Sequence, residues 1–139
     1  MNESSYEFTV LKEAHRFDFV SKGPINIVKS IVYFKTTDPY LVTLSMGNPL
    51  PNGVLDVLTI NDNGDRNKIL ATVIRSIGVF LNIHPDHTVM FSGSTPARTR
   101  LYKMVISKEL HQLQNSYLVQ GITESSIEVL IRVTTTSAF

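Results

Sequence analysis

One short segment of the chain combines residue types that suit the binding of an anion. The segment at residues 92–100 reads SGSTPARTR, so a glycine turn is followed at once by a predicted helix. The first amide groups of a helix have no partner within the helix and carry the positive end of its dipole. Ser94 and Thr95 add hydroxyl donors, and Arg98 and Arg100 add two cations. The turn at residues 92–102 is therefore predicted to bind a phosphate group or a nucleic-acid backbone.

The two arginines stand at the end of a helix where cations are unfavourable, by about 0.3–1 kcal/mol each. Lys103 follows Arg100 on the same side of the predicted helix, and no Asp or Glu occurs between His87 and Lys108. A bound anion would offset this local positive charge. The predicted anion-binding residues are Ser94, Thr95, Arg98, Arg100 and Lys103. An alternative interpretation is that Arg98 pairs inside the fold with one of three carboxylates: Asp56, Asp62 or Asp65.

A histidine and a tyrosine near this segment make catalysis a second hypothesis. His87 precedes the turn, and Tyr102 lies four residues after Arg98. Either can move a proton as general acid or base while Arg98 and Arg100 stabilise the charge of a phosphoryl transition state. One alternative function is therefore a toxin-like, metal-independent ribonuclease. Another is a non-catalytic structural or interaction protein, so whether the chain is an enzyme stays open.

No motif for a metal or a cofactor is present. Residues 61–65 read NDNGD and resemble the start of a calcium loop, but the sixth position is Arg66 and the twelfth is Thr72. His84 and His87 have no cysteine and no third ligand near them in the sequence. Neither G-x-x-x-x-G-K nor G-x-G-x-x-G occurs. We expect no metal and no cofactor.

Hydrophobic periodicity predicts the elements that position the candidate site. The first 60 residues alternate between apolar and polar types and contain turn signals, which predicts an antiparallel meander of four or five strands. From Asn61 onward the apolar spacing changes to that of a helix, from about Asp65 to Asn82, capped by Asn63 or Asp65. A short strand at residues 88–92 leads to a second helix, which begins with Pro96 after the capping residue Thr95.

The second helix is predicted to end near Leu110 or Gln112, with Ala97, Leu101, Met104 and Val105 facing the core. Strands at residues 117–121 and 127–133 complete the chain. The order predicts an α+β fold: an N-terminal antiparallel β-meander, then helix, strand, helix and two C-terminal strands. The simplest arrangement is one sheet with two helices packed on it.

Length and composition limit the class of protein. With 139 residues, 42% apolar and 18% charged, the chain suits a single domain over residues 1–139 and excludes a disordered or fibrous protein. The net charge of +1 favours no partner, and no apolar run approaches the ~18 residues of a membrane span. The absence of cysteine and of a secretory signal leads us to expect a cytoplasmic protein. We expect no membrane partner, and a homodimer is compatible with the sequence.

Three segments also carry a resemblance to a known family. The stretch GSTPARTRLY at residues 93–102, together with NGD at residues 63–65 and ILATV at residues 69–73, is similar to a bacterial family of unknown function. The similarity runs from about Tyr6 to Gly121 and includes the turn at residues 21–23 and Lys29. The chain departs from the family pattern at Asn48 and Val57, where acids are common, which argues against a metal or acid role there. The resemblance implies a small single-domain bacterial protein and no particular chemistry.

Overall fold

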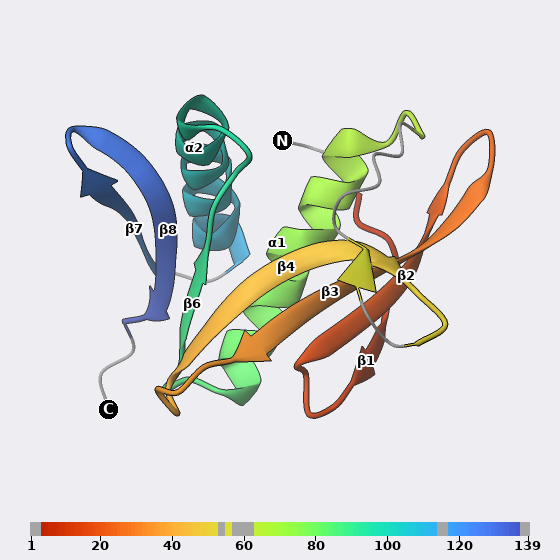
Figure 1. The fold of residues 1–139 in the computed structure, drawn as a ribbon, viewed down its shortest axis with the longest axis horizontal. Helices are drawn as coiled ribbons and strands as arrows, with labels where there is room; N and C mark the ends of the chain where they lie inside the picture. The colour runs from red at the N-terminus through yellow and green to blue at the C-terminus, as the bar shows by residue number, and fades with distance from the viewer. Residues whose placement is uncertain (1–3, 53–54, 57–62, 114–116, 137–139) are drawn as a thin grey trace.

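The computed structural model describes residues 4–52, 55–56, 63–113 and 117–136. These residues form eight strands and two helices (Figure 1). The strands are β1 (Thr9–Leu11), β2 (Arg16–Lys22), β3 (Asn26–Lys35), β4 (Leu41–Pro49), β5 (Leu55–Asp56), β6 (Thr88–Phe91), β7 (Tyr117–Glu124) and β8 (Ile127–Thr135). The helices are α1 (Arg66–Ile83) and α2 (Pro96–Leu113).

All eight strands belong to one mixed sheet, in the order β1-β2-β3-β4-β6-β8-β7, with β5 added to β4. The strands β1 to β5 pair antiparallel in chain order, which confirms the predicted meander. Of the last part of the predicted meander, residues 54–60, only residues 55–56 lie within the described part, where they form β5, and Val57 lies outside it. The α+β class and the two helices packed on one sheet are confirmed, and both helices lie behind the sheet in Figure 1.

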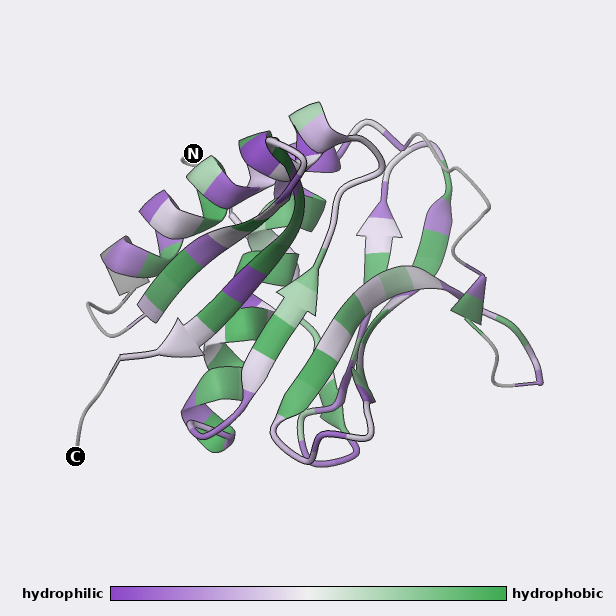
Figure 2. Ribbon diagram, turned by 60° about the vertical axis from the view of Figure 1, so that its left-hand side comes forward, coloured by the Kyte–Doolittle hydropathy of each residue, from purple (hydrophilic) through white to green (hydrophobic). Residues whose placement is uncertain are grey.

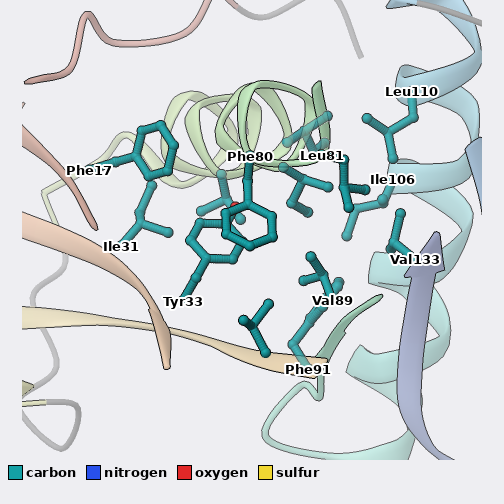
Figure 3. Close-up of a cluster of buried hydrophobic side chains, with 14 of the residues drawn as sticks. Phe17, Ile31, Tyr33, Phe80, Leu81, Val89, Phe91, Ile106, Leu110 and Val133 are labelled. Atoms are coloured by element: carbon teal, nitrogen blue, oxygen red, sulfur yellow. The ribbon is translucent and has the colours of Figure 1, made fainter. Parts of the chain in front are cut away.

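The core lies between the sheet and the two helices. Tyr33 of β3 stacks on Phe80 of α1 with ring centroids 4.4 Å apart, and the Tyr33 hydroxyl shares a hydrogen bond of 2.7 Å with Ser76. From α2, Ile106 and Leu110 enter the same core and approach Val133 of β8 (Figure 3). Apolar residues at helical spacing thus bury one face of each helix. Within the described residues, no helix is both long and apolar enough to cross a membrane.

The predicted core face of α2 is wrong. Ala97, Leu101 and Met104 are exposed and Val105 is only partly buried, whereas the fully buried residues are Thr99, Ile106 and Leu110. Both sides of this helix carry apolar residues, so periodicity alone does not choose between them. The turn before α2 determines which side of the helix faces the sheet, because it holds Thr99 against Gly93. In Figure 2, hydrophobic and hydrophilic bands alternate along α2 at the upper left.

The chain connections bring the starts of both helices to one end of the sheet. Strands β4 and β6 are parallel neighbours, and α1 connects them. A connecting helix of this kind begins beyond the carboxyl end of the first strand and returns to the amino end of the second. Helix α2 follows the carboxyl end of β6, so it begins at the same edge as α1, the upper end in Figure 1.

Candidate functional site

The start of α2 is capped by hydrogen bonds with side chains of its own segment. Thr95 precedes the helix, and its hydroxyl accepts a hydrogen bond of 3.1 Å from the backbone N–H of Arg98. Its carbonyl accepts from the N–H of Thr99 at 2.9 Å and from the Thr99 hydroxyl at 3.0 Å. Thr95 is therefore the N-cap and Pro96 the first helical residue, as the sequence predicts.

Gly93 lets the turn fold tightly onto this first helical turn. Its N–H donates to the hydroxyl of buried Thr99 at 3.0 Å. A Cβ on Gly93 would lie 2.9 Å from the Thr99 backbone nitrogen and 3.0 Å from the Arg98 carbonyl carbon, which are distances that only a shift of backbone would relieve. Glycine is required here for close approach.

These contacts reduce the number of backbone donors available to a ligand. Pro96 has no N–H, and the N–H groups of Arg98 and Thr99 are hydrogen-bonded to Thr95. Of the first-turn amides, Ala97 alone forms no hydrogen bond within the described residues. An anion at this end would therefore be bound mainly by side chains, in contrast to a phosphate loop built from backbone amides.

The two arginines are exposed and have no protein partner in the described part of the chain. Neither Arg98 nor Arg100 forms an ion pair or a hydrogen bond there through its side chain, and Arg98 does not lie on the ring of Tyr102. The carboxylate of Asp65 is bound elsewhere, and Asp62 lies outside the described residues. Tyr102 packs partly against the core.

Lys103 differs from the two arginines because its charge is already paired. Its ammonium lies 2.7 Å from Glu128 Oε1 of β8, with the two side chains 33% and 19% exposed. The Glu128 side chain lies against Gly121 of β7, where a Cβ would come within 2.8 Å of its carboxyl carbon. This ion pair links α2 to the sheet.

The start of α1 carries two more cations. Arg66 is exposed, and the ammonium of Lys68 lies 4.5 Å from the centroid of the Tyr6 ring. No acidic residue occurs in the first turn of α1 or of α2. Because both helices begin at one end of the sheet, the structure brings Arg66 and Lys68 to the same end as Arg98 and Arg100. We call this set of four residues the basic end.

The predicted side-chain cap of α1 is wrong. Asp65 stands at the N-cap position, but its side chain forms no capping hydrogen bond. Its carboxylate accepts instead from the hydroxyls of Tyr6, at 2.5 Å, and Ser21, at 2.6 Å. Asn63 donates to the carbonyl of Ile25 at 2.7 Å and to Ser21 Oγ at 3.1 Å. Both side chains bind the N-terminal strands, so they fix the loop before α1 without capping the helix.

A buried lysine belongs to the same region. Lys29 of β3 is 6% exposed, and its ammonium donates to Asn48 Oδ1 at 3.0 Å. Burial lowers the pKa of Lys29, and the negative charge of Asp65 partly opposes that effect. Burial, followed by the contact with Asp65, raises the pKa of Tyr6. This polar network ties β2, β3 and β4 to the start of α1.

His87 lies at the opposite end of β6 from the arginines. It immediately precedes β6, whereas Arg98 and Arg100 follow the turn after that strand. The constellation proposed for a ribonuclease, with His87 beside the two arginines, is therefore not assembled. His87 Nδ1 instead donates to Asp86 Oδ1 at 2.8 Å, and this contact lowers the pKa of Asp86.

The structure places three histidines together at that opposite end, a cluster that the sequence does not reveal. The ring of His84 lies 4.9 Å from those of His15 and His87, and His15 and His87 are 6.3 Å apart. They line a cavity of about 340 Å³ with Glu13, Lys35 and Asp38 among its other residues. No group of three or more His, Asp or Glu residues in the described ranges is arranged to hold a metal ion.

Hydrogen bonds fix the protonated nitrogen of each imidazole in the cluster. His15 Nδ1 donates to the carbonyls of Lys12 and Glu13, and His84 Nε2 donates to the carbonyl of Glu13 at 2.7 Å. His15 Nε2 is buried without a partner among the described residues. Burial, aided by neighbouring His84, lowers the pKa of His15. Residues 12–14 have φ of 51°, 55° and 65°, so a strained left-handed turn carries these carbonyls.

The sequence profile of a family of unknown function (DUF6934) matches residues 2–139. The chain belongs to this family. Neither the curated proteins nor the solved structures contain a match to the chain. The segments that carry the resemblance lie at the starts of both helices: residues 63–65 form the loop before α1, residues 69–73 lie in α1, and residues 93–102 form the turn and the start of α2. The family adds no activity to the geometry described above.

Proposed function

We propose that the protein binds the phosphate backbone of a nucleic acid through its basic end. The binding residues are Arg66, Lys68, Arg98 and Arg100, with the hydroxyls of Ser94 and Thr95 as additional donors. The observation that carries the proposal is the position of the four cations. Arg66, Lys68 and Arg98 occupy the first turns of the two helices and Arg100 follows in the second turn of α2. All four lie at one end of the sheet, and no acid occurs in those first turns.

The position of arginine at the start of α2 is unfavourable for helix stability. A cation in the first turn of a helix costs about 0.3–1 kcal/mol, because it faces the positive end of the dipole. Arg98 and Arg100 have no partner among the described residues that would offset this cost. A phosphate bound to either guanidinium group would offset it, since arginine binds phosphate through two parallel hydrogen bonds. An exposed arginine is common on any protein, so the arrangement at both helices matters more than either residue alone.

The basic end favours a polymer of phosphates over a single phosphate ion. The start of α2 offers one unpaired amide in its first turn, so it lacks the set of backbone donors that encloses a lone phosphate. The cations stand instead at two separate helix starts, which can contact phosphates spaced along a strand. Binding without cleavage is the simpler proposal because, of the two candidate general acids or bases, His87 lies at the other end of β6 and Tyr102 packs partly against the core.

Fluorescence anisotropy with labelled single-stranded RNA and duplex DNA, over a range of salt concentrations, tests the proposal. The variant Arg98→Gln/Arg100→Gln removes two cations from the basic end. The control Lys12→Gln/Lys35→Gln removes two exposed cations from elsewhere, so both variants change the net charge from +1 to −1. We expect the arginine variant to lower the slope of log K against log salt by about 1.4 on single strands. Equal losses in both variants, or wild-type binding that does not depend on salt, would refute the proposal.

A further inference from the structure

Helix α2 presents an apolar surface on the side opposite the core. Leu101 is 54% exposed and Met104 is 68% exposed, and Ala97 is exposed beside them. The three residues are spaced at i, i+4 and i+7, so they lie next to one another on the helix. Thr99, Ile106 and Leu110 bury the other side. The helix thus keeps a small apolar surface, which we call the outer face of α2, in contact with solvent.

Cations surround this outer face. Arg100, Met104 and Lys108 are spaced four residues apart and form one row along the helix, about 12 Å long. Arg98 stands one turn before Leu101 on the next row. No Asp or Glu occurs from Pro96 to Lys108. An apolar centre with a positive border fits a ligand that is anionic and also exposes flat apolar groups.

We infer that the ligand of the basic end is a single-stranded nucleic acid, whose phosphates contact Arg98, Arg100 and Lys108 and whose unpaired bases lie on Leu101 and Met104. This inference rests on the proposed function. A duplex hides the faces of its bases, so it would leave Leu101 and Met104 without a partner, whereas a single strand offers those faces. The methionine sulfur is polarizable and makes favourable contacts with aromatic rings.

A second copy of the chain fits this surface poorly. A symmetric contact between two α2 helices would place the row of Arg100 and Lys108 against the same row of the partner, and like charges repel. An anionic membrane surface would attract the same cations, but it has no bases that could contact Leu101 and Met104. These two occupants are outcomes of the test below.

The test compares three labelled probes: a short oligouridylate, an RNA duplex of the same length, and a strand of the sugar-phosphate backbone that lacks bases. The variant Leu101→Ser/Met104→Ser removes the apolar centre and leaves every cation. The control Val28→Ser/Ile83→Ser changes two side chains of similar exposure, 52% and 51%, elsewhere in the fold. Melting temperatures confirm that each variant is folded.

We expect the wild-type protein to prefer the single strand over the duplex by about tenfold or more, since burial of one exposed apolar side chain against a base contributes a factor of about that size. The Leu101/Met104 variant should lose about tenfold in affinity for oligouridylate, with its salt slope and its binding to the baseless strand unchanged. The control should bind like the wild type.

Each other outcome overturns the inference in a recognisable way. Undiminished binding of oligouridylate by the Leu101/Met104 variant refutes base contact and leaves the proposed function intact. Equal affinity of the wild-type protein for the duplex and the single strand likewise refutes base contact and leaves the proposed function intact. Absence of binding to all three probes refutes the proposed function itself. Binding to vesicles that contain phosphatidylserine, or a dimer that dissociates when Leu101 is changed, assigns the outer face to a membrane or to a second copy.

Discussion

Replacing Arg98 with glutamate should stabilise the protein while it destroys the proposed site. Position 98 is the third residue of α2, and Thr95 already caps the helix through the backbone N–H of that residue. A Ser or Thr cap followed three residues later by Glu forms a capping box, in which the carboxylate accepts from the N–H of the cap. The sequence provides the threonine of this box and places an arginine where the glutamate would stand.

The expected gain follows from the local geometry. Removing the cation of Arg98 from the first turn gains about 0.3–1 kcal/mol, and placing an anion there gains a similar amount. Because the position is exposed, solvent reduces both effects, so we expect a total of about 1 kcal/mol. For a chain of 139 residues this corresponds to a rise in melting temperature of about 3 °C.

Thermal unfolding by circular dichroism at low salt, together with urea unfolding, measures the change. Lys108→Glu is the charge-matched control, since Lys108 is exposed in the fourth turn of the same helix, before its last turn, where the dipole has little effect. The control should unfold like the wild type. Arg98→Ala should gain only the stabilisation that comes from removing the cation, because it adds no anion. A lower melting temperature for Arg98→Glu and for Arg98→Ala would show that the guanidinium pairs within the fold, and the reasoning would be wrong.

Three further changes test other parts of the structure. Tyr6→Phe removes a hydroxyl that donates to a carboxylate and accepts from a backbone N–H, so the free energy of unfolding in urea should fall by about 2–4 kcal/mol. Tyr40→Phe, at an exposed ring, should change it by less than about 0.5 kcal/mol; equal effects would contradict the network. Lys103→Met leaves Glu128 unpaired and should cost about 1 kcal/mol in urea unfolding without changing RNA affinity; weaker RNA binding would return Lys103 to the anion site. Because burial lowers the pKa of His15 in the folded state, the unfolded chain takes up that proton first as the pH falls. Stability should therefore be constant above about pH 6.5 and decrease below it, and a His15→Gln variant with the same pH profile would contradict this assignment.

The local elements could be predicted from the sequence because their signals are local. The helix predicted from about Asp65 to Asn82 is observed at Arg66–Ile83, and the second helix begins at Pro96 as predicted. Apolar periodicity and a capping residue define such bounds without help from distant residues. The meander is predicted for the same reason, since its strands pair with their neighbours in the chain.

The parts that could not be predicted depend on contacts between distant residues. Asp65 fails to cap α1 because Tyr6 and Ser21, far away in the chain, bind its carboxylate. His15 meets His84 only because the β1–β2 turn reaches the end of α1. The sequence does not determine which side of α2 faces the sheet, because both sides carry apolar residues. The hydrogen bond from Gly93 to Thr99 decides this orientation.

The position of β6 in the sheet determines that the starts of both helices, and with them the four cations, lie at one end of the protein. Two arginines in one helix start are common enough to need no ligand. Because β6 lies parallel to β4, however, α1 and α2 must begin at the same edge, and the positive ends of their dipoles lie at one end of the protein. Adding four cations to that edge raises the local potential further, at the expense of helix stability. The carboxylate that precedes α1, Asp65, is hydrogen-bonded to two hydroxyls and lies near the buried ammonium of Lys29, and Glu128 of β8 is paired with Lys103. A protein under selection for stability alone would place acids in both first turns, which is why we propose that these cations have an anionic partner outside the chain.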